Sequence, residues 1–313
     1  ADALLKAGLS AAHVPTEFGG EGADALATVI IIEEVARVCG SSSLIPAVNK
    51  LGSLPLMLSG SKAQKEKWLP QLAKGKGFSY CLSESEAGSD ASALKTKAEL
   101  KDGSWVINGS KKWISNAGVS EFYTVIAQTD PSKGSKGITA FIVEKDFPGF
   151  SVGQKLDKLG MRGSPTAELI FDNCEVPEAN VMGALNGGVR VLMSGLDYER
   201  AVLAAGPIGI MEACMDVVIP YIHDREQFGQ SIGEFQLIQG KVADMYTVLQ
   251  AGRSFAYTVA KNLDMLGVEH VRQVAGRPIV PKALPDTHLA PLRNRHRLRT
   301  GHHERSTWLE SAH

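Results

Sequence analysis

One glutamate in this chain of 313 residues has the surroundings that proton transfer requires. Glu199 lies in an apolar run over residues 189–221. On a helix of 3.6 residues per turn, it shares one stripe with three leucines, Leu192, Leu196 and Leu203. No residue one turn away carries a positive charge. Burial would therefore disfavour the charged carboxylate and raise its pKa, as a general base near neutral pH requires. The alternative is a helix-end or subunit-contact glutamate that pairs with a distant arginine.

Two further stretches contain residue types suited to a flat or anionic ligand. The loop Leu82–Asp90 consists of small and polar residues and follows a predicted strand, so its backbone N–H groups and hydroxyls could bind a ligand. Trp113 and Ser115 could stack on a ring system and hydrogen-bond to its edge. Each stretch has a common structural alternative, a solvated turn for the loop and a half-buried core residue for the tryptophan.

Composition limits the class of protein. The chain is 44% hydrophobic and 21% charged, which is typical of a soluble globular protein. No run approaches eighteen apolar residues, so we expect no membrane span. The four cysteines are scattered and have no histidine at ligand spacing. We expect these residues to be reduced core thiols and expect no metal site. The four cysteines are Cys39, Cys81, Cys174 and Cys214.

The apolar periodicity changes twice along the chain, from helical to alternating and back. The predicted N-terminal helices cover residues 24–38, ending in a loop at Ser41–Ser43, then 47–58 with a bend or break at Pro55, and 62–72 with Ser61 as N-cap. Short strands are predicted at 95–100, 105–108, 122–128, 138–143, 150–152, 167–171 and 174–176, with a hairpin turn at Asp102-Gly103. Two helical runs follow, 189–221 with kinks at Pro207 and Pro220, and 238–266. This order predicts an α+β chain with a small sandwich or barrel between helical parts.

Six stretches in this order resemble the acyl-CoA dehydrogenase family over about residues 11–270. They are Pro15–Gly20, Ala63–Pro70, Leu82–Asp90, Trp113–Asn116, Leu159–Ser164 and Arg225–Gln230. Within that family, the isovaleryl-CoA and long-chain types carry the base on the earlier helix, in a Leu-Asp-x-Glu-Arg context. Leu196–Arg200 matches that context, so the resemblance is greatest to the isovaleryl-CoA type.

The resemblance implies a homotetrameric FAD enzyme of leucine breakdown. It would oxidise isovaleryl-CoA to 3-methylcrotonyl-CoA and pass electrons to an electron-transferring flavoprotein, with Glu199 removing the α-proton. Its location would be the mitochondrial matrix in a eukaryote and the cytoplasm in a bacterium, and no nucleic-acid partner is implied. The implied FAD contacts are Tyr80, Cys81, Leu82, Ser83, Glu84, Ala87, Gly88, Ser89, Trp113, Ile114 and Ser115, with Arg225 and Gln236 reaching the FAD of a neighbouring subunit. The implied substrate contacts are Ser89, Ser135, Lys136, Arg190, Asp197 and Arg200.

The last part of the chain departs from that pattern. We expect an N-terminal helical part over residues 1–76, a middle β domain over 77–185, a partial C-terminal helical domain over 186–270 and a divergent tail over 271–313. The tail holds eight Lys/Arg and three Asp/Glu, a balance of +5 against −6 for the rest. We interpret it as sequence read in a shifted frame, on a chain truncated at both ends, and expect activity only from the complete protein. The alternatives are a basic extension that binds nucleic acid, a non-catalytic flavin- or acyl-CoA-binding remnant, and a different short-chain acyl-CoA dehydrogenase.

Overall fold

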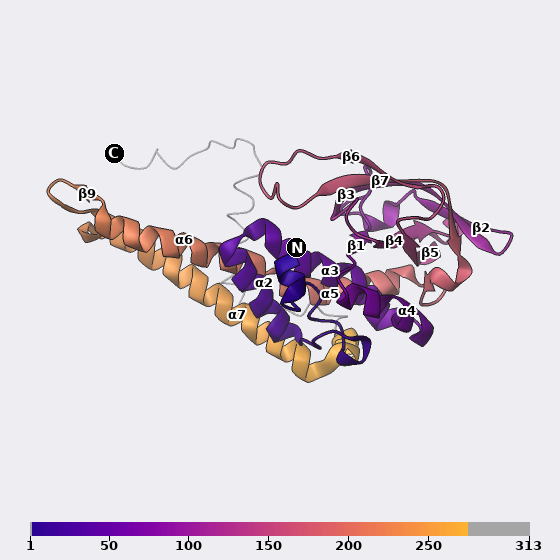
Figure 1. The fold of residues 1–313 in the computed structure, drawn as a ribbon, viewed down its shortest axis with the longest axis horizontal. Helices are drawn as coiled ribbons and strands as arrows, with labels where there is room; N and C mark the ends of the chain where they lie inside the picture. The colour runs from indigo at the N-terminus through magenta and orange to yellow at the C-terminus, as the bar shows by residue number, and fades with distance from the viewer. Residues whose placement is uncertain (1, 275–313) are drawn as a thin grey trace, which may run out of the picture. The chain divides into compact units, whose positions relative to one another are not determined.

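The described part of the chain combines helices at both ends with a sheet in the middle (Figure 1). A computed structural model describes residues 2–274, and it describes their side chains except at Ser194, Asp197 and residues 266–274. The chain divides into two units, residues 1–273 and 274–313. Because the described residues end at 274, most of the predicted tail 271–313 lies outside them. The predicted α+β class is confirmed.

The N-terminal helices begin at the residues whose side chains can cap them. The carboxylate of Asp24 accepts the N–H of Ala27 at 2.7 Å. Ser61 and Gln64 cap each other's backbone N–H groups in a capping box. Both predicted helix starts are confirmed. The elements are α1 (Asp2–Lys6), η1 (Thr16–Phe18), α2 (Ala25–Val38), α3 (Gly40–Ser59) and α4 (Lys62–Ala73).

Helix α3 is longer and more continuous than the sequence indicates. Cys39 is extended and ends α2, but the chain returns to helix at Gly40, so the predicted loop at Ser41–Ser43 is wrong. Of the bend or break predicted at Pro55, the break does not occur, because the helix continues through this residue. A proline removes one helical hydrogen bond. Here Leu54 and Leu56 on either side are almost completely buried, and their packing outweighs that loss.

The middle of the chain forms one eight-stranded sheet. Its strands follow the order β6-β7-β3-β2-β4-β5-β8, with β1 pairing parallel to β4. The predicted strands 167–171 and 174–176 are one strand, β7, which continues through Asn173 at a positive φ of 50°. The strands are β1 (Phe78–Cys81), β2 (Lys97–Lys101), β3 (Ser104–Ser115), β4 (Phe122–Gln128), β5 (Ile138–Glu144), β6 (Phe150–Lys155), β7 (Thr166–Pro177) and β8 (Val181–Met182). The short helices η2 (Ala91–Ala93), η3 (Pro131–Gly137) and η4 (Glu178–Asn180) lie between strands.

The β2–β3 hairpin turns at the predicted pair. Asp102 and Gly103 both have positive φ, 50° and 81°, as a two-residue turn of the twisted hairpin type requires. The turn joins Lys101 to Ser104, which are paired in the antiparallel register. This prediction is confirmed.

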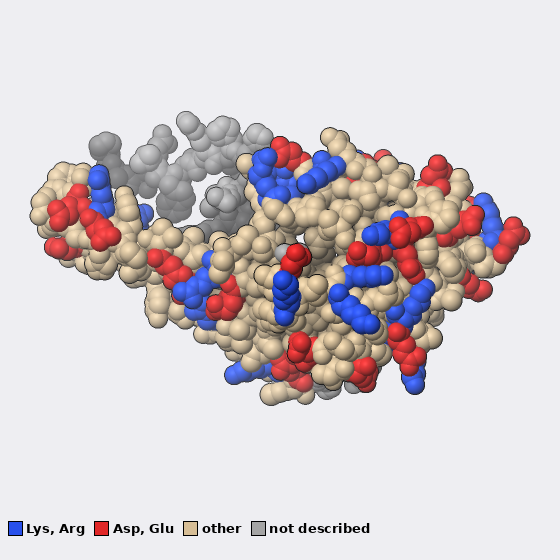
Figure 2. Space-filling view, viewed as in Figure 1, with Lys and Arg blue, Asp and Glu red and all other residues tan. Residues whose placement is uncertain are grey.

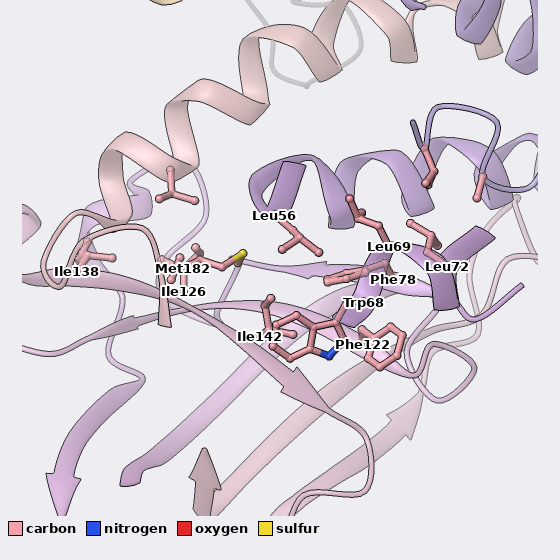
Figure 3. Packing of buried hydrophobic residues seen from close by; sticks show 14 of the residues in the cluster. Leu56, Trp68, Leu69, Leu72, Phe78, Phe122, Ile126, Ile138, Ile142 and Met182 are labelled. Carbon is pink, nitrogen blue, oxygen red and sulfur yellow. The ribbon is translucent and has the colours of Figure 1, made fainter. Parts of the chain in front are cut away.

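The sheet is buried on both faces along β4. Phe122 and Ile126 pack into a cluster with Leu56 of α3 and Trp68 of α4 (Figure 3). Tyr123, Val125 and Ala127 point to the opposite face, into a second cluster that includes Trp105, Phe141 and Phe171. Alternate side chains of one strand thus belong to two cores, so the strand has a continuous apolar sequence. The first core joins the N-terminal helices to the sheet.

The C-terminal helices pack on α2 and α3. In place of the predicted kink at Pro207, the chain has a boundary between two helices: α5 ends at Leu203, and Pro207 lies in the first turn of α6, where a proline is tolerated. Helix α6 approaches α2 so closely that a Cβ on Gly209 would lie 2.0 Å from the carbonyl oxygen of Glu33. Arg253 of α7 binds both Glu33 and Glu212, which ties three helices together. The elements are α5 (Gly188–Leu203), α6 (Ala205–Asp224), β9 (Glu226–Gln227), β10 (Gln230–Ser231), η5 (Ile232–Glu234) and α7 (Gln236–Val274).

Two expectations from composition concern a membrane span and the cysteines. By length and composition only, the stretch Gly188–Asp224 is apolar enough to cross a membrane, a test that core helices of soluble proteins also pass. All four cysteines are free, but only Cys81 and Cys174 are buried. The prediction of core thiols is therefore wrong for Cys39 and Cys214, which lie on the exposed ends and faces of helices.

On the face shown in Figure 2, acidic and basic side chains are interspersed over the described residues.

Candidate functional site

Glu199 is buried on α5, as its apolar surroundings predicted. Only 4% of the residue is exposed, and its Oε2 atom has no hydrogen-bond partner among the described residues. Burial raises the pKa of Glu199 to about 7, and the charge of Lys50 opposes that shift. Leu203 is the exception in the predicted stripe: it is 43% exposed, because α5 ends there. The carboxylate thus has the environment of a proton acceptor near neutral pH.

Contacts between α5 and α3 place this carboxylate. A Cβ on Gly195 would lie 3.8 Å from Cγ of Pro55, so the two helices meet there. One turn further along α5, the ring of Tyr198 lies under the ammonium group of Lys50, one turn earlier on α3. The two helices are therefore antiparallel, and their contact continues toward Glu199.

The loop after β1 is fixed to β3. The ammonium group of Lys111 donates to the carbonyl of Leu82 at 3.1 Å, and the N–H of Lys112 donates to the carbonyl of Ser83 at 2.8 Å. The hydroxyl of Tyr80 is buried and has no hydrogen-bond partner among the residues described. The structure therefore brings the start of the loop beside the strand that carries Trp113, as a single binding surface requires.

Glu84 differs from the other predicted FAD contacts, because its carboxylate is used inside the protein. It accepts hydrogen bonds from the ammonium group of Lys111 at 2.6 Å, from the N–H of Lys95 at 2.6 Å and from the N–H of Thr96 at 3.2 Å. Burial raises the pKa of Glu84, but the charge and hydrogen bonds of Lys111 outweigh it and lower that pKa below its usual value. The side chain therefore supports the loop and does not face a ligand.

Burial divides the remaining predicted FAD contacts into three groups. Gly88, Ser89 and Trp113 are exposed, and no atom lies within 4 Å of a Cβ placed on Gly88. Leu82, Ser83 and Ser115 are half-buried. The last three residues have side chains buried in the core, so only their backbone could contact a ligand. These residues are Cys81, Ala87 and Ile114.

Trp113 has an unusual backbone. Its φ is 57°, and the β3–β7 register shifts between Lys111 and Ile114. A bulge of this kind redirects a side chain. The indole is 57% exposed, which is large for an apolar ring. One face of a flat ligand could stack there, beside Ser115, whose carbonyl accepts the hydroxyl of Ser79 at 2.8 Å.

The predicted acyl-CoA contacts come from three segments. Ser135 and Lys136 are exposed on η3, which contacts both α5 and the short helix η2 that follows Ser89. Arg190 is exposed in the first turn of α5, whose start packs on β5. The structure brings these segments together. Arg200 is exposed on α5, and the side chain of Asp197 lies outside the described residues.

Arg225 and Gln236 are not brought to this surface. Arg225 ends α6 and Gln236 begins α7, on either side of the hairpin of β9 and β10. In Figure 1 this hairpin lies at the end of α6 and α7 that is remote from the sheet. Both side chains are exposed, and Phe228 between them is 95% exposed. Within one chain they cannot contact a ligand on Trp113.

The sequence interpretation missed a buried charged residue that acts on the base. Lys50 is 3% exposed, and its ammonium nitrogen lies 4.4 Å from the centroid of the Tyr198 ring. A signal was available, because Lys50 is the only charged residue of the 20-residue helix α3. Lysine is almost never buried without a partner.

Comparisons with known proteins identify the family. The family model for the N-terminal domain of acyl-CoA dehydrogenases matches residues 1–76, that for the middle domain residues 79–174, and that for the C-terminal domain residues 186–290. The third match extends past residue 270, where we expected the family pattern to end.

Individual relatives agree with the models. A mitochondrial 2-methylacyl-CoA dehydrogenase of Solanum tuberosum is 54% identical over 252 residues, which cover 80% of this chain and 61% of that protein. A mitochondrial isovaleryl-CoA dehydrogenase of Arabidopsis thaliana is also 54% identical over 252 residues, with 80% and 62% covered. A solved acyl-CoA dehydrogenase of Bacillus anthracis, complexed with FAD, is 35% identical with a TM-score of 0.78, and the match covers 82% of this chain and 45% of that one. The chain thus spans less than two thirds of the length of these relatives.

Proposed function

Because the chain belongs to the acyl-CoA dehydrogenase family, we propose that it forms the base and much of the ligand surface of an FAD-dependent acyl-CoA dehydrogenase. The substrate is a short branched-chain acyl-CoA, isovaleryl-CoA in leucine breakdown, and the product is the 2,3-enoyl-CoA. The single observation that carries the proposal is the buried carboxylate of Glu199, with a pKa of about 7 and one oxygen that has no hydrogen-bond partner in the described part of the chain.

The surface around Trp113 fits a flavin. It offers an exposed indole for stacking, an open approach at Gly88, and a buried Tyr80 hydroxyl to which no described residue is hydrogen-bonded. The three features match a flat heteroaromatic ring with polar atoms at its edge. When bound, FAD accepts the hydride from the β-carbon of the substrate. The relative of known structure that is complexed with FAD supports the same cofactor here.

Glu199 removes the proton from the α-carbon, next to the thioester carbonyl. With a pKa of about 7, roughly half of the molecules hold the carboxylate in its basic form at neutral pH. The apolar surroundings also exclude water, which would otherwise compete for the carboxylate. Proton acceptance neutralises a buried charge, so the environment favours the direction of the reaction.

The exposed polar groups around the start of α5 position the acyl-CoA. Ser89, Lys136 and Arg190 come from separate segments that meet there, and two of them are cations suited to the phosphates of CoA. Arg225 lies remote from these groups, which supports a contact with the FAD of a neighbouring subunit in a tetramer. Electron-transferring flavoprotein is the proposed acceptor of the electrons.

The choice of isovaleryl-CoA rests on two observations. Leu196–Arg200 has the sequence context that the isovaleryl type shares, and the base lies on α5. Two of the similar plant proteins act, by name, on isovaleryl-CoA and on 2-methylacyl-CoA, both of them branched acyl chains. These proteins are also named mitochondrial, which agrees with the matrix as location if the host is a eukaryote.

The test replaces Glu199 by glutamine in the full-length protein that contains this chain. We expect exchange of the α-hydrogen of isovaleryl-CoA with solvent deuterium to fall by about 10²–10⁴-fold, the usual contribution of a general base, while flavin content stays unchanged. Glu33→Gln is the matched control, because Glu33 is also a buried carboxylate but lies on α2, where its Oε1 accepts a hydrogen bond from Arg253 of α7. Equal exchange rates in both variants would contradict the assignment. Bound flavin without any exchange in the unmodified protein would support the non-catalytic remnant instead.

A further inference from the structure

Lys50 is a buried cation in an otherwise uncharged helix. It follows Asn49 in the middle of α3. The apolar residues Val48 and Leu54 of the same helix are both buried. Burying an ammonium group is costly unless a charge or an aromatic ring compensates for the lost water. The ring of Tyr198 supplies part of that compensation at 4.4 Å. Burial of the Lys50 ammonium group therefore lowers the stability of the fold, and packing alone does not explain why a lysine stands there.

The antiparallel contact of α3 and α5 directs this cation toward the base. Pro55 of α3 lies beside Gly195 of α5, and Lys50, earlier on α3, lies beside Tyr198, later on α5. Glu199 follows Tyr198 directly and is four residues after Gly195, which places it on the side of α5 that meets α3. Lys50 and Glu199 are both at least 95% buried, so little water screens their attraction.

We propose that Lys50 is a positioning residue for Glu199: its buried ammonium group, held on the Tyr198 ring, keeps the neighbouring carboxylate in the charged form that accepts a proton. The coupling between the two groups is independent of the proposed function, but its consequence for catalysis rests on that function. Because each charge favours the other, the effect is reciprocal.

Two carboxylates on other elements also face this cluster. Asp24 and Asp264 both raise the pKa of Lys50, as does Glu199, against the larger effect of burial, which lowers it to about 8. Asp264 of α7 accepts the N–H of Ala25 at 2.7 Å, so it is fixed at the start of α2 beside Asp24. Lys50 is therefore mainly charged at neutral pH, where Glu199 titrates.

One further titratable group faces Lys50, the imidazole of His13. Burial, and secondly the charge of Lys50, lower the pKa of His13 well below its usual value. Its Nε2 atom lies 2.8 Å from the hydroxyl of Ser53. His13 is therefore neutral where Glu199 titrates and does not contribute a second charge to the cluster.

The first test leaves Lys50 in place. In the full-length protein with isotope-labelled lysine, the Lys50 ammonium group is followed by NMR through a pH titration, assigned by its loss in Lys50→Arg. We expect its midpoint near pH 8 in the unmodified protein and about one pH unit lower in Glu199→Gln, because the variant lacks the negative charge. An identical midpoint in both proteins would overturn the proposal.

The second test removes the cation. Infrared difference spectra identify the protonated carboxyl of Glu199 by its loss in Glu199→Gln, and its titration is followed in three variants. Lys50→Met should move the midpoint up from about 7 by about one pH unit, Lys50→Arg should restore it, and the exposed Lys62→Met should leave it unchanged. Shifts of equal size in Lys50→Met and Lys62→Met would overturn the proposal. If Lys50→Met does not fold, the NMR titration decides alone.

The catalytic consequence has a separate result. In the FAD-loaded protein, the pH profile of kcat/KM for isovaleryl-CoA should shift upward in Lys50→Met by the amount seen in the infrared titration, with Lys50→Arg close to the unmodified protein. A coupling without any dehydrogenase activity would overturn the proposed function and uphold the pairing of Lys50 with Glu199. An activity profile that stays in place while the infrared midpoint moves would overturn the positioning role.

Discussion

Replacing Lys111 by methionine should destabilise the protein by about 3–5 kcal/mol, the usual cost of leaving a buried charge without its partner. The side chain of Lys111 is completely buried, and its ammonium group lies 2.6 Å from Oε1 of Glu84. Methionine has a similar volume, so the packing changes little. The loss comes from the carboxylate of Glu84, which keeps its backbone donors but loses its only buried cation among the described residues.

A double-mutant cycle separates the free energy of the Lys111–Glu84 ion pair from the effect of Lys111→Met on packing. For a chain of this size, about 3–5 kcal/mol corresponds to roughly 6–20 °C in Tm, at about 2–4 °C per kcal/mol. Lys111→Met combined with Glu84→Gln should recover part of this loss, because no unpaired charge then remains buried. Thermal unfolding followed by circular dichroism measures all three variants.

The neighbouring Lys112 supplies the control. It is partly exposed, and its ammonium group lies 3.9 Å from Glu168. A pair of this kind contributes about 0–1 kcal/mol, so Lys112→Met should melt close to the unmodified protein. If Lys111→Met melts at the temperature of Lys112→Met, the buried pair is not the support of the loop after β1.

The pair of Glu84 and Lys111 should also make the stability of the protein depend on pH in the acidic range. Lys111 and the backbone donors hold the pKa of Glu84 below its usual value in the folded protein. A depressed folded pKa contributes stability that is present above the unfolded value, about 4.3, and is lost as the pH falls through the folded value. Stability should therefore decline on acidification, and Glu84→Gln should reduce that decline.

Three further predictions follow from the structure. Gly149→Ala should cost about 2 kcal/mol or more in urea unfolding, since Gly149 has φ 81° and a Cβ there would lie 2.3 Å from the carbonyl oxygen of Asp172. Gly103→Ala, with the same φ and open space, should cost only about 1 kcal/mol, and equal losses would contradict the steric argument. The raised pKa of Glu199 stabilises the fold below the unfolded value and loses that effect as pH rises through about 7, so the unmodified protein should lose about 3 kcal/mol relative to Glu199→Gln between pH 5 and 8. Steady-state kinetics should favour isovaleryl-CoA over octanoyl-CoA by roughly 10–200-fold, and equal efficiencies would indicate another substrate class.

Features that depend on a few neighbouring residues could be predicted from the sequence. Ser61 and Gln64 are three residues apart, and the capping box follows from that spacing. The hairpin at Asp102-Gly103 depends only on the positive φ that these two residues tolerate. The burial of Glu199 follows from the apolar residues one turn away on α5. In each case the physical cause is local.

Features that depend on distant segments could not be predicted. Helix α3 continues through Pro55 because its neighbours pack against α5 and the sheet, and propensity contains no record of that packing. Glu84 lies in a polar loop, but its partner Lys111 is 27 residues further along the chain. Lys50 and Glu199 are separated by most of the sheet, so only the fold shows that their helices meet.

The most direct test of the central claim is a single-turnover measurement on the FAD-loaded full-length protein. Isovaleryl-CoA is mixed with the protein without oxygen, and the visible absorbance of the flavin is followed in the unmodified protein, Glu199→Gln and Glu33→Gln. We predict that the absorbance falls as the flavin is reduced in the unmodified protein and in Glu33→Gln, and stays constant in Glu199→Gln on the same time scale. Reduction at the same rate in all three proteins would show that the buried carboxylate of α5 is not the base.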